Sequence, residues 1–357
     1  MLLRSVELTR FRCFKTALLE PGDETTFIFG KNGSGKTSLI EAIYYLAHGR
    51  SFRTAQVEEL SWERNGLFAL VAHTITDQHV PLTIASQWTA NERVALQIGG
   101  QRARGFIDAA AVLPVRVVDS DVHLIVEGAP ANRRRFLDWG VFHVEHSFVS
   151  VWRRYQRALR QRNVALRRQL SSKEILIWDA ELAETGERIT RFRADYVEEL
   201  SRHLQPLALA LLNTAVTLKL DQGWPADLSL TAAFDRSWGN DQRRCTTTVG
   251  PHRADLRIEI SGRAVAPQVS RGQQKLLASA MTLSQLSYAA ATGATRGCLL
   301  VDDPHAELDV DNFERLLATI EAIPAQRIIT GTEEMPRNSA NGARMFHVKP
   351  GKIERVL

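Results

Sequence analysis

The sequence predicts an α/β fold in which two strand-rich segments flank a mostly helical insertion. Three observations support this prediction. A glycine-rich loop lies between a strand-like run and a helical pattern, at residues 25–47. The apolar run CLLVDD at 298–303 is typical of a central parallel strand buried on both faces. From about residue 122 to about 217 the pattern is mostly helical, without turn-rich strands.

The first strand-rich segment begins with VELTRF, whose alternation is typical of a half-buried strand, and TTFIF leads into the glycine-rich loop. The runs FALVAHTI, PLTIASQW and RVALQIGGQRARGF are also strand-like, and the last turns at Gly99-Gly100. The run PVRVV ends the segment at Val118. We expect residues 1–121 to form the first part of a phosphate-binding lobe.

The loop Gly30-x-x-x-x-Gly35-Lys36-Thr37 matches the P-loop pattern in full. Its glycines let successive N–H groups turn inward, and the following helix points its positive end at the same place. Lys36 is expected to reach the β- and γ-phosphates of ATP, and Thr37 to bind Mg²⁺. The alternative is a glycine-rich turn with a chance lysine. The predicted nucleotide ligands are Gly30, Lys31, Asn32, Gly33, Ser34, Gly35, Lys36, Thr37 and Ser38.

The spacing of the cysteines and the absence of long apolar runs argue against disulfide-rich, zinc-binding, secreted and membrane-spanning proteins. The three cysteines, Cys13, Cys245 and Cys298, form no CxxC pair, so the sequence suggests neither a disulfide framework nor a zinc site. The N-terminus lacks the apolar core of a signal peptide, and no stretch of about 18 uncharged apolar residues occurs. We therefore expect a cytoplasmic protein that does not cross a membrane.

Positive charge is concentrated in the helical insertion, which we expect to span residues 122–245. The net charge is +5, yet residues 131–170 hold ten arginines and two acids. An apolar stripe at helical spacing, from Trp152 to Leu170, leaves arginines on another face. Such a surface suits a polyanion, and a solvated helical face is the alternative. The candidate DNA-binding residues are Arg133, Arg134, Arg135, Arg153, Arg157 and Arg160.

The second strand-rich segment, predicted as residues 246–357, supplies the rest of the nucleotide site. LRIEISGRAVAP contains a hairpin turn at Ser261-Gly262. A carboxylate at the end of a buried strand suits a hard cation beside triphosphate, so Asp302 is expected to support Mg²⁺. Asp303 would hold the attacking water as general base. The alternative is that Asp302 and Asp303 serve only to cap a helix.

A second phosphate site is expected where Ser270, Gly272 and Gln273 precede a helical run. A serine followed by glycine at a helix start offers a hydroxyl, backbone N–H groups and a dipole to an anion. Since the P-loop already holds the γ-phosphate, this site would serve the nucleotide of a second copy, in a two-fold dimer. The alternative is an ordinary helix cap.

These motifs in this order resemble the ABC-type ATPases, and specifically the SMC-like branch that works on DNA. Within that branch the chain is similar to the RecF family of bacterial recombination mediators. The stretches SFRT, GAPANRRRFLDW, TTTVGPHRADL, VSRGQQK and VDDPHAELD stand in the family's order, and the resemblance covers nearly the whole chain. The implied fold is a P-loop ABC/SMC-like ATPase head with a helical inserted lobe.

The resemblance assigns roles to individual residues. It implies that Lys36 and Thr37 are Walker A ligands, that Asp302 is the Walker B magnesium residue, and that Arg12 lies beside the nucleotide. Ser270, Gly272 and Gln273 become the signature that contacts the partner's γ-phosphate. Asp309 becomes the D-loop residue at the dimer interface.

Several positions depart from the general ABC pattern. Asp119-Ser120-Asp121 stands where a Q-loop glutamine is usual, and Thr332 where transporters place a switch histidine. Asp303 replaces the usual glutamate and is one methylene shorter, which suits a slow, switch-like ATPase. Pro304-His305 is more typical of ABC proteins in general.

The leading hypothesis is a DNA-binding ATPase whose ATP-bound dimer clamps duplex DNA near a single-strand gap. The resemblance implies that it acts with RecO and RecR to help load RecA. The alternative is an ATPase subunit of a membrane transporter, against which stand the long separation of Lys36 from Asp302 and the arginine-rich insertion. A coiled-coil SMC protein is excluded because no heptads are sustained. His252 is expected to be structural, since no metal partner or nucleophile is spaced to pair with it.

Overall fold

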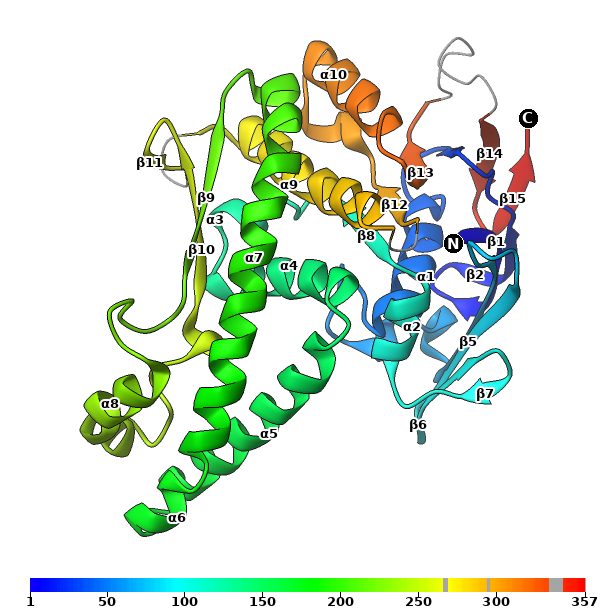
Figure 1. Cartoon of the computed structure of the whole chain (residues 1–357). Helices are drawn as coiled ribbons and strands as arrows, with labels where there is room; N and C mark the ends of the chain where they lie inside the picture. Colours follow the sequence, from blue (N-terminus) through cyan, green and yellow to red (C-terminus); the bar gives the residue numbers. More distant parts are fainter. Residues whose placement is uncertain (266–268, 294–295, 334–342, 357) are drawn as a thin grey trace. The chain divides into compact units, whose positions relative to one another are not determined.

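The structure, a computed structural model, describes residues 1–265, 269–293, 296–333 and 343–356. The chain forms two compact units, shown in Figure 1. The first comprises residues 1–122 and 279–357, and the second comprises residues 123–278. The predicted α/β fold with a helical insertion is confirmed. Among the described residues, no helix is both long and apolar enough to cross a membrane.

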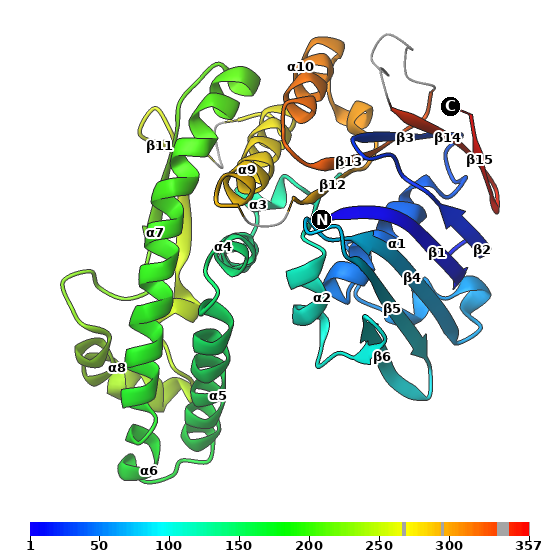
Figure 2. The same ribbon diagram turned by 45° about the vertical axis from the view of Figure 1, so that its right-hand side comes forward.

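One sheet of the first unit is antiparallel and has six strands in the order β2-β1-β4-β5-β6-β7. Apolar and polar residues alternate along β1 and β4, because one face of each strand is buried. Figure 2 shows β1, β4 and β5 side by side. The strands are β1 (Leu2–Phe11), β2 (Phe14–Leu19), β4 (Leu67–Ile75), β5 (Pro81–Thr89), β6 (Glu92–Ile98) and β7 (Gln101–Arg102).

The second sheet of this unit is parallel except at one edge, and its order is β15-β14-β3-β13-β12-β8. In its register Val301 of β12 pairs with Val118 of β8 and with Ile329 of β13. The carboxyl ends of β3, β8, β12 and β13 therefore meet at one edge, where ligands bind in such sheets. The strands are β3 (Thr25–Phe29), β8 (Val115–Val118), β12 (Cys298–Val301), β13 (Gln326–Gly331), β14 (Arg344–Lys349) and β15 (Lys352–Arg355).

The helix α1 (Lys36–His48) forms the centre of the core of the first unit. Its side chains are buried almost all around, from Leu39 to Ala47. They belong to one apolar cluster with Leu8 and Phe68 of the antiparallel sheet and Ile28 of the parallel sheet. A helix that is apolar on every side is stable only when it is enclosed. The loop before α1 is therefore attached to a rigid support.

Shorter elements complete the first unit. The helices α2 (Phe106–Val112) and α10 (Val310–Glu321) belong to it, and α9 (Arg271–Ala291) begins in the second unit and ends in the first. Three short 3₁₀ turns occupy Val57–Leu60, Trp62–Arg64 and Pro304–Glu307.

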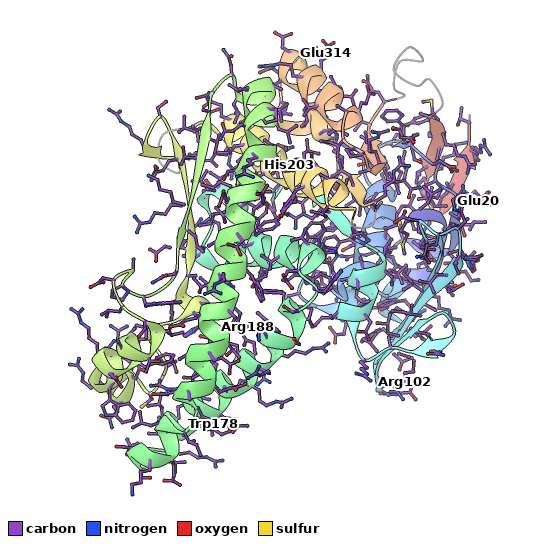
Figure 3. All side chains as sticks on the ribbon, in the orientation of Figure 1. Glu20, Arg102, Trp178, Arg188, His203 and Glu314 are labelled. Atoms are coloured by element: carbon purple, nitrogen blue, oxygen red, sulfur yellow. The ribbon has the colours of Figure 1, made fainter. Side chains whose placement is uncertain are left out.

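The second unit is built around the long helix α7 (Asp179–Leu212), which packs beside α5 (Phe148–Arg167). Trp178, Arg188 and His203 mark the course of α7 in Figure 3. Its other helices are α3 (Leu124–Glu127), α4 (Pro130–Val144), α6 (Ser172–Leu176) and α8 (Leu230–Arg244). A small sheet has the order β11-β10-β9, formed by β9 (Val216–Asp221), β10 (Asp255–Ile260) and β11 (Arg263–Ala264), and a 3₁₀ turn lies at Pro251–Arg253.

The second unit differs from the sequence expectation at two points. The chain divides at 278/279 and not at the expected 245/246, because β10 pairs with β9 of the second unit and not with either sheet of the first unit. Leu170, expected on the apolar stripe of α5, lies beyond the end of that helix and is exposed. The hairpin turn at Ser261-Gly262 is confirmed between β10 and β11.

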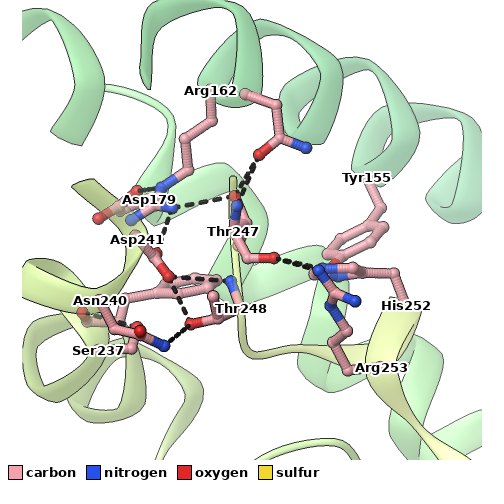
Figure 4. A network of polar contacts seen from close by, with 12 residues as sticks. Tyr155, Arg162, Asp179, Ser237, Asn240, Asp241, Thr247, Thr248, His252 and Arg253 are labelled. Atoms are coloured by element: carbon pink, nitrogen blue, oxygen red, sulfur yellow. Dashed lines mark hydrogen bonds and ion pairs between the residues drawn. The ribbon is translucent and has the colours of Figure 1, made fainter. Parts of the chain in front are cut away.

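A buried ionic network ties α5, α7 and α8 to the loop that follows α8 (Figure 4). Arg162 is fully buried and donates from Nε to Asp179 at 2.6 Å. Its Nη1 donates to Asp241 at 2.6 Å and to Thr247 at 2.9 Å. The guanidinium also lies over the ring of Phe234. Such a network specifies one packing, because a buried charge is stable only with its partners in place.

Arg162→Met is expected to destabilise the chain strongly, because it leaves the buried carboxylate of Asp241 without its cation. The expected loss is about 3–5 kcal/mol in the free energy of unfolding, measured by urea denaturation of the full chain. Arg160→Met on the same helix is the matched control, since Arg160 is exposed, and it should change the value by about 0.5 kcal/mol or less. Equal effects of the two substitutions would show that the network does not stabilise the fold.

Candidate nucleotide site

The glycine-rich loop joins β3 to α1 and takes a backbone conformation that requires glycine at three places. Gly30 has φ 154° and Gly35 has φ 112°. A Cβ at Gly30 would lie 2.3 Å from the carbonyl oxygen of Val348, and one at Gly35 would lie 2.7 Å from the Cys13 sulfur. Gly33, with φ 77°, needs glycine for its dihedral angle alone. The loop is therefore specified by both backbone strain and close packing.

The start of α1 is suited to an anion. No acidic residue stands in its first turn, and no side chain caps its N-terminus. The first N–H groups of a helix have no partner within it, and the helix dipole is positive at this end. The hydroxyl of Ser34 is buried and has no hydrogen-bond partner among the described residues. A phosphate group in the loop would supply these missing acceptors, so the residues present fit the phosphates of ATP.

Lys36 folds back over the loop. Its ammonium donates to the carbonyl oxygens of Gly30 at 2.7 Å and of Lys31 at 3.1 Å. Burial lowers the pKa of Lys36, and the charges of Asp303 and Asp302 oppose that shift. The ammonium is thus held over the place where the phosphates would lie, near both aspartates.

Three polar side chains join the loop to the strand ends. The hydroxyl of Thr37 donates to Oδ1 of Asp302 at 3.0 Å, and Thr330 donates to the same oxygen at 2.7 Å. Burial raises the pKa of Asp302, while the bonds from Thr330 and Thr37 act in the opposite direction. Thr37 and Asp302 would hold Mg²⁺ together with phosphate oxygens, as Mg²⁺ usually takes one or two carboxylates and keeps several waters. In the described part of the chain, no group of three or more His, Cys, Asp or Glu side chains could hold a metal.

Asp303 follows at the same edge of the sheet. Its backbone N–H donates to the hydroxyl of Thr330 at 3.0 Å, and its φ of 42° lies in the left-handed region. This bend turns the chain away from β12 and leaves Asp303 partly exposed beside the loop. A base must reach a water at the γ-phosphate, and the role of Asp303 as that base stays a prediction.

Arg12, expected beside the nucleotide, is engaged elsewhere. Its Nε and Nη2 donate to the two carboxylate oxygens of the buried Glu41 at 2.8 Å and 2.6 Å. Its Nη1 donates to the carbonyl oxygen of Glu59 at 3.0 Å. Arg12 therefore secures α1 from behind the loop, because Glu41 is part of that helix. A direct contact between Arg12 and the nucleotide stays a prediction.

Arg53 is a candidate that sequence reasoning missed. It follows α1 in the SFRT stretch, and its Nη1 lies 3.5 Å from Glu41. Its side chain is 47% exposed, and its positive charge partly offsets the rise that burial causes in the pKa of Asp302. The unusual SFRT stretch was the only sequence signal, since nothing in its spacing indicates proximity to Asp302.

Asp119 is a second missed residue. It follows β8, level with Asp302 in the parallel register. Burial, then the charge of Asp121, raises the pKa of Asp119 to about 6, and Asp302 adds to the shift. Its Oδ1 accepts from the N–H of Asp121 at 3.1 Å. A carboxylate thus occupies the strand end where a Q-loop glutamine would be expected.

The residues expected to form the signature lie in the second unit, at the start of α9. The hydroxyl of Ser270 accepts from the N–H of Gln273 at 3.3 Å, and Oε1 of Gln273 accepts from the N–H of Ser270 at 3.1 Å. These reciprocal bonds form a capping box. Asp309 caps α10 of the first unit in a similar way, accepting from the N–H of Asn312 at 2.8 Å. Ser270, Gln273 and Asp309 are exposed.

The candidate DNA-binding arginines differ in their exposure and in the contacts that they already make. Arg133 makes a two-pronged ion pair with Asp255, at 2.7 Å and 3.0 Å, so its guanidinium is already occupied. Arg134 donates from Nη1 to the carbonyl oxygen of Ala254 at 2.8 Å and is half-buried. The remaining four are exposed: Arg135, Arg153, Arg157 and Arg160.

Asp119→Asn is expected to stabilise the metal-free chain at neutral pH. A carboxyl whose pKa is raised from 3.8 to about 6 in the fold contributes stability at low pH that is lost as the pH rises from about 4 to 6. At pH 7.5 the substitution should raise the free energy of unfolding by about 1–3 kcal/mol, and the difference should vanish near pH 4. Urea denaturation across this range measures it. Parallel pH profiles for the two proteins would contradict the assignment.

The chain matches known proteins over nearly its whole length. Residues 2–354 match the family model described as RecF/RecN/SMC N terminal domain. A protein of Marinomonas sp. (strain MWYL1) described as "DNA replication and repair protein RecF" is 36% identical, covering 93% of this chain and 91% of its own. The protein of the same description from Cellvibrio japonicus is also 36% identical, with 99% of each chain covered.

Solved structures support the fold. A structure described as the recombination mediator protein RecF with ATP aligns with a TM-score of 0.89 at 24% identity, covering 100% of this chain and 98% of the other. An SMC head bound to the C-terminal winged-helix domain of ScpA aligns with a TM-score of 0.61 at 15% identity, covering 100% and 97%. The family match and the identity to the relatives over almost the full chain show that the protein belongs to the RecF family of DNA replication and repair proteins.

Proposed function

We propose that the protein is an ATP-dependent DNA-binding protein of recombinational repair, whose ATP-bound dimer clamps duplex DNA near single-strand gaps. The observation that carries the proposal is the cluster of Lys36, Thr37 and Asp302 at one sheet edge. In this arrangement a loop built for phosphate and a carboxylate suited to Mg²⁺ lie side by side. Membership of a family of replication and repair proteins supports DNA as the partner.

In this proposal the chain's own residues bind and orient ATP. Gly30 to Ser38 surround the phosphates with N–H groups, and Lys36 offsets the charge on the β- and γ-phosphates. Bound Mg²⁺ would neutralise charge that develops during hydrolysis. Asp303 positions a water and takes its proton, and its short side chain favours slow turnover. Hydrolysis then acts as a switch that releases the clamp.

The dimer would be closed by the signature of the partner copy. Ser270, Gly272 and Gln273 lie at an exposed helix start, which can offer N–H groups and a hydroxyl to a γ-phosphate. Asp309, exposed at the start of α10, would lie at the same interface. Because the γ-phosphate favours only the closed state, its loss removes the preference for the dimer.

DNA would be held mainly through its phosphates. Arg153, Arg157 and Arg160 recur at spacings of four and three residues, so they share one face of α5. All three are exposed, as is Arg135 on α4. The proposed partners RecO, RecR and RecA, and a cytoplasmic location, follow from the family alone.

ATP is expected to convert the wild-type chain from monomer to dimer. Lys36→Ala should abolish this change by removing a phosphate contact, whereas Ser270→Arg should keep ATP binding and lose only the pairing. Sedimentation with ATP, with ADP and without nucleotide measures the masses, and equilibrium binding measures ATP affinity. Loss of ATP binding in the Ser270→Arg monomer would contradict contact with the partner's nucleotide.

DNA binding with ATP should weaken steeply as salt rises. In a plot of the logarithm of the binding constant against the logarithm of the salt concentration, each phosphate contact contributes roughly 0.9 to the steepness of the slope. Arg157→Gln should therefore make the slope shallower by about that amount. Arg154→Gln on the same helix is the matched control, because Glu181 and Glu184 already bind its guanidinium. Fluorescence anisotropy with duplex DNA at several salt concentrations gives both slopes. DNA binding that is absent or insensitive to salt would rule out the clamp.

A further inference from the structure

A separate pocket lies within the second unit, among α4, α5, α7 and the turn at Pro251–Arg253. Its volume is about 270 Å³, and its walls include Arg134, Arg135, Asp138, Trp152, Arg193 and His252. None of these residues belongs to the nucleotide loop or to the expected signature, although Arg134 and Arg135 are also among the candidate DNA-binding residues. The pocket therefore requires its own explanation.

The pocket has more positive charge than its own acid can balance. Three arginines and one carboxylate, Asp138, line it. Asp138 is already engaged, because Arg193 donates to it from Nε at 2.9 Å and from Nη2 at 3.0 Å. Nη1 of Arg193 donates to the carbonyl oxygen of Pro251 at 2.7 Å. Arg134 and Arg135 therefore face the pocket without a carboxylate partner within it.

Arg134 retains hydrogen-bonding capacity. Its Nη1 donates to the carbonyl oxygen of Ala254 at 2.8 Å, whereas its Nε and Nη2 make no hydrogen bond to the described residues. Burial, followed by the charge of Arg193, lowers the pKa of Arg134. The charges of Asp255 and Asp138 oppose this shift, but neither carboxylate accepts a hydrogen bond from Arg134. A half-buried guanidinium whose N–H groups lack an acceptor is costly unless an anion lies beside it.

The histidine in the wall adds no charge. His252 accepts at Nδ1 from the hydroxyl of Tyr155 at 2.6 Å and donates from Nε2 to the carbonyl oxygen of Thr247 at 3.1 Å, the tautomer that suits both partners (Figure 4). Burial lowers the pKa of His252 to about 4, and the charges of Arg253 and Arg134 contribute. His252 is therefore a neutral, fixed part of the wall, and the arginines alone provide the positive charge.

We propose that this pocket binds a phosphate group, with Arg134 and Arg135 as its ligands. A guanidinium offers paired N–H donors that match phosphate oxygens, and a doubly charged anion offsets the excess charge. Arg135 is exposed and can close over the anion from the rim. The phosphate can come from free phosphate compounds or from a DNA backbone, and the pocket does not depend on the proposed clamp because free phosphate tests it without DNA.

The test uses inorganic phosphate and full-length protein that carries Lys36→Ala, so that the nucleotide loop contributes little. At constant ionic strength, phosphate should slow hydrogen exchange of backbone amides in residues 130–138 and 250–254. Arg134→Gln, added to this background, should raise the phosphate concentration for half-maximal protection at least tenfold. Arg135→Gln is the second variant, since an exposed side chain can be replaced without disturbing the fold. Arg154→Gln, outside the pocket and already paired with Glu181, is the matched control and should leave the midpoint unchanged.

The outcomes separate the two sources of phosphate. If an unmodified duplex competes with phosphate for this protection, the site takes a DNA phosphate, and if it does not compete, the site takes a free phosphate compound. Absence of protection, or midpoints within twofold of the background for both pocket variants, overturns the proposal. Equal protection by glutamate at the same ionic strength also overturns it, because a general carboxylate site would then explain the pocket.

Discussion

The hydrogen bond from Thr37 to Asp302 is the interaction on which the nucleotide site depends. It joins two residues 265 positions apart, one at the start of α1 and the other at the end of β12. Thr330 donates to the same carboxylate oxygen from the neighbouring strand. Because α1 is enclosed by two sheets and β12 lies inside one of them, neither end of this bond can move freely. The site is therefore preorganised before any ligand binds.

The second unit uses buried charge in a different way. Some of its arginines are buried in ion pairs, and others are exposed to solvent. Arg162 and Arg193 are buried and ion-paired with carboxylates, and Arg193 also donates to a backbone oxygen, which fixes the packing of α4, α5, α7 and α8. The exposed arginines on the same helices then stand on a rigid support. Binding to a polyanion needs little rearrangement when the support is already ordered.

Structural elements and site residues could be predicted from the sequence where neighbouring residues determine them. The loop at Gly30–Lys36 and the Asp302 strand are readable because spacing and apolar runs determine them. The sequence did not predict a pairing between strands or side chains when the two partners are far apart in the chain. The pairing of β10 with β9, which moves the boundary of the unit, depends on a non-local choice between sheets. The same holds for Arg12, whose carboxylate partner Glu41 could not be recognised as buried from its sequence. Neighbouring arginines on α4 also differ, since Arg133 is ion-paired and Arg135 is exposed. Which of them faces the protein depends on the orientation of the helix about its axis, which the sequence of the helix does not determine.

The most direct test of the central claim is the binding of Mn²⁺, as a spectroscopic substitute for Mg²⁺, in the presence of saturating ATP. Electron paramagnetic resonance of free Mn²⁺ gives the affinity for the wild type and for Asp302→Asn. If the loop and the strand end form one site, the variant should bind the metal at least tenfold more weakly, while keeping its affinity for metal-free ATP. Equal metal affinity in the two proteins would contradict the account, since Asp302 would then lie outside the site that Thr37 and the phosphates form.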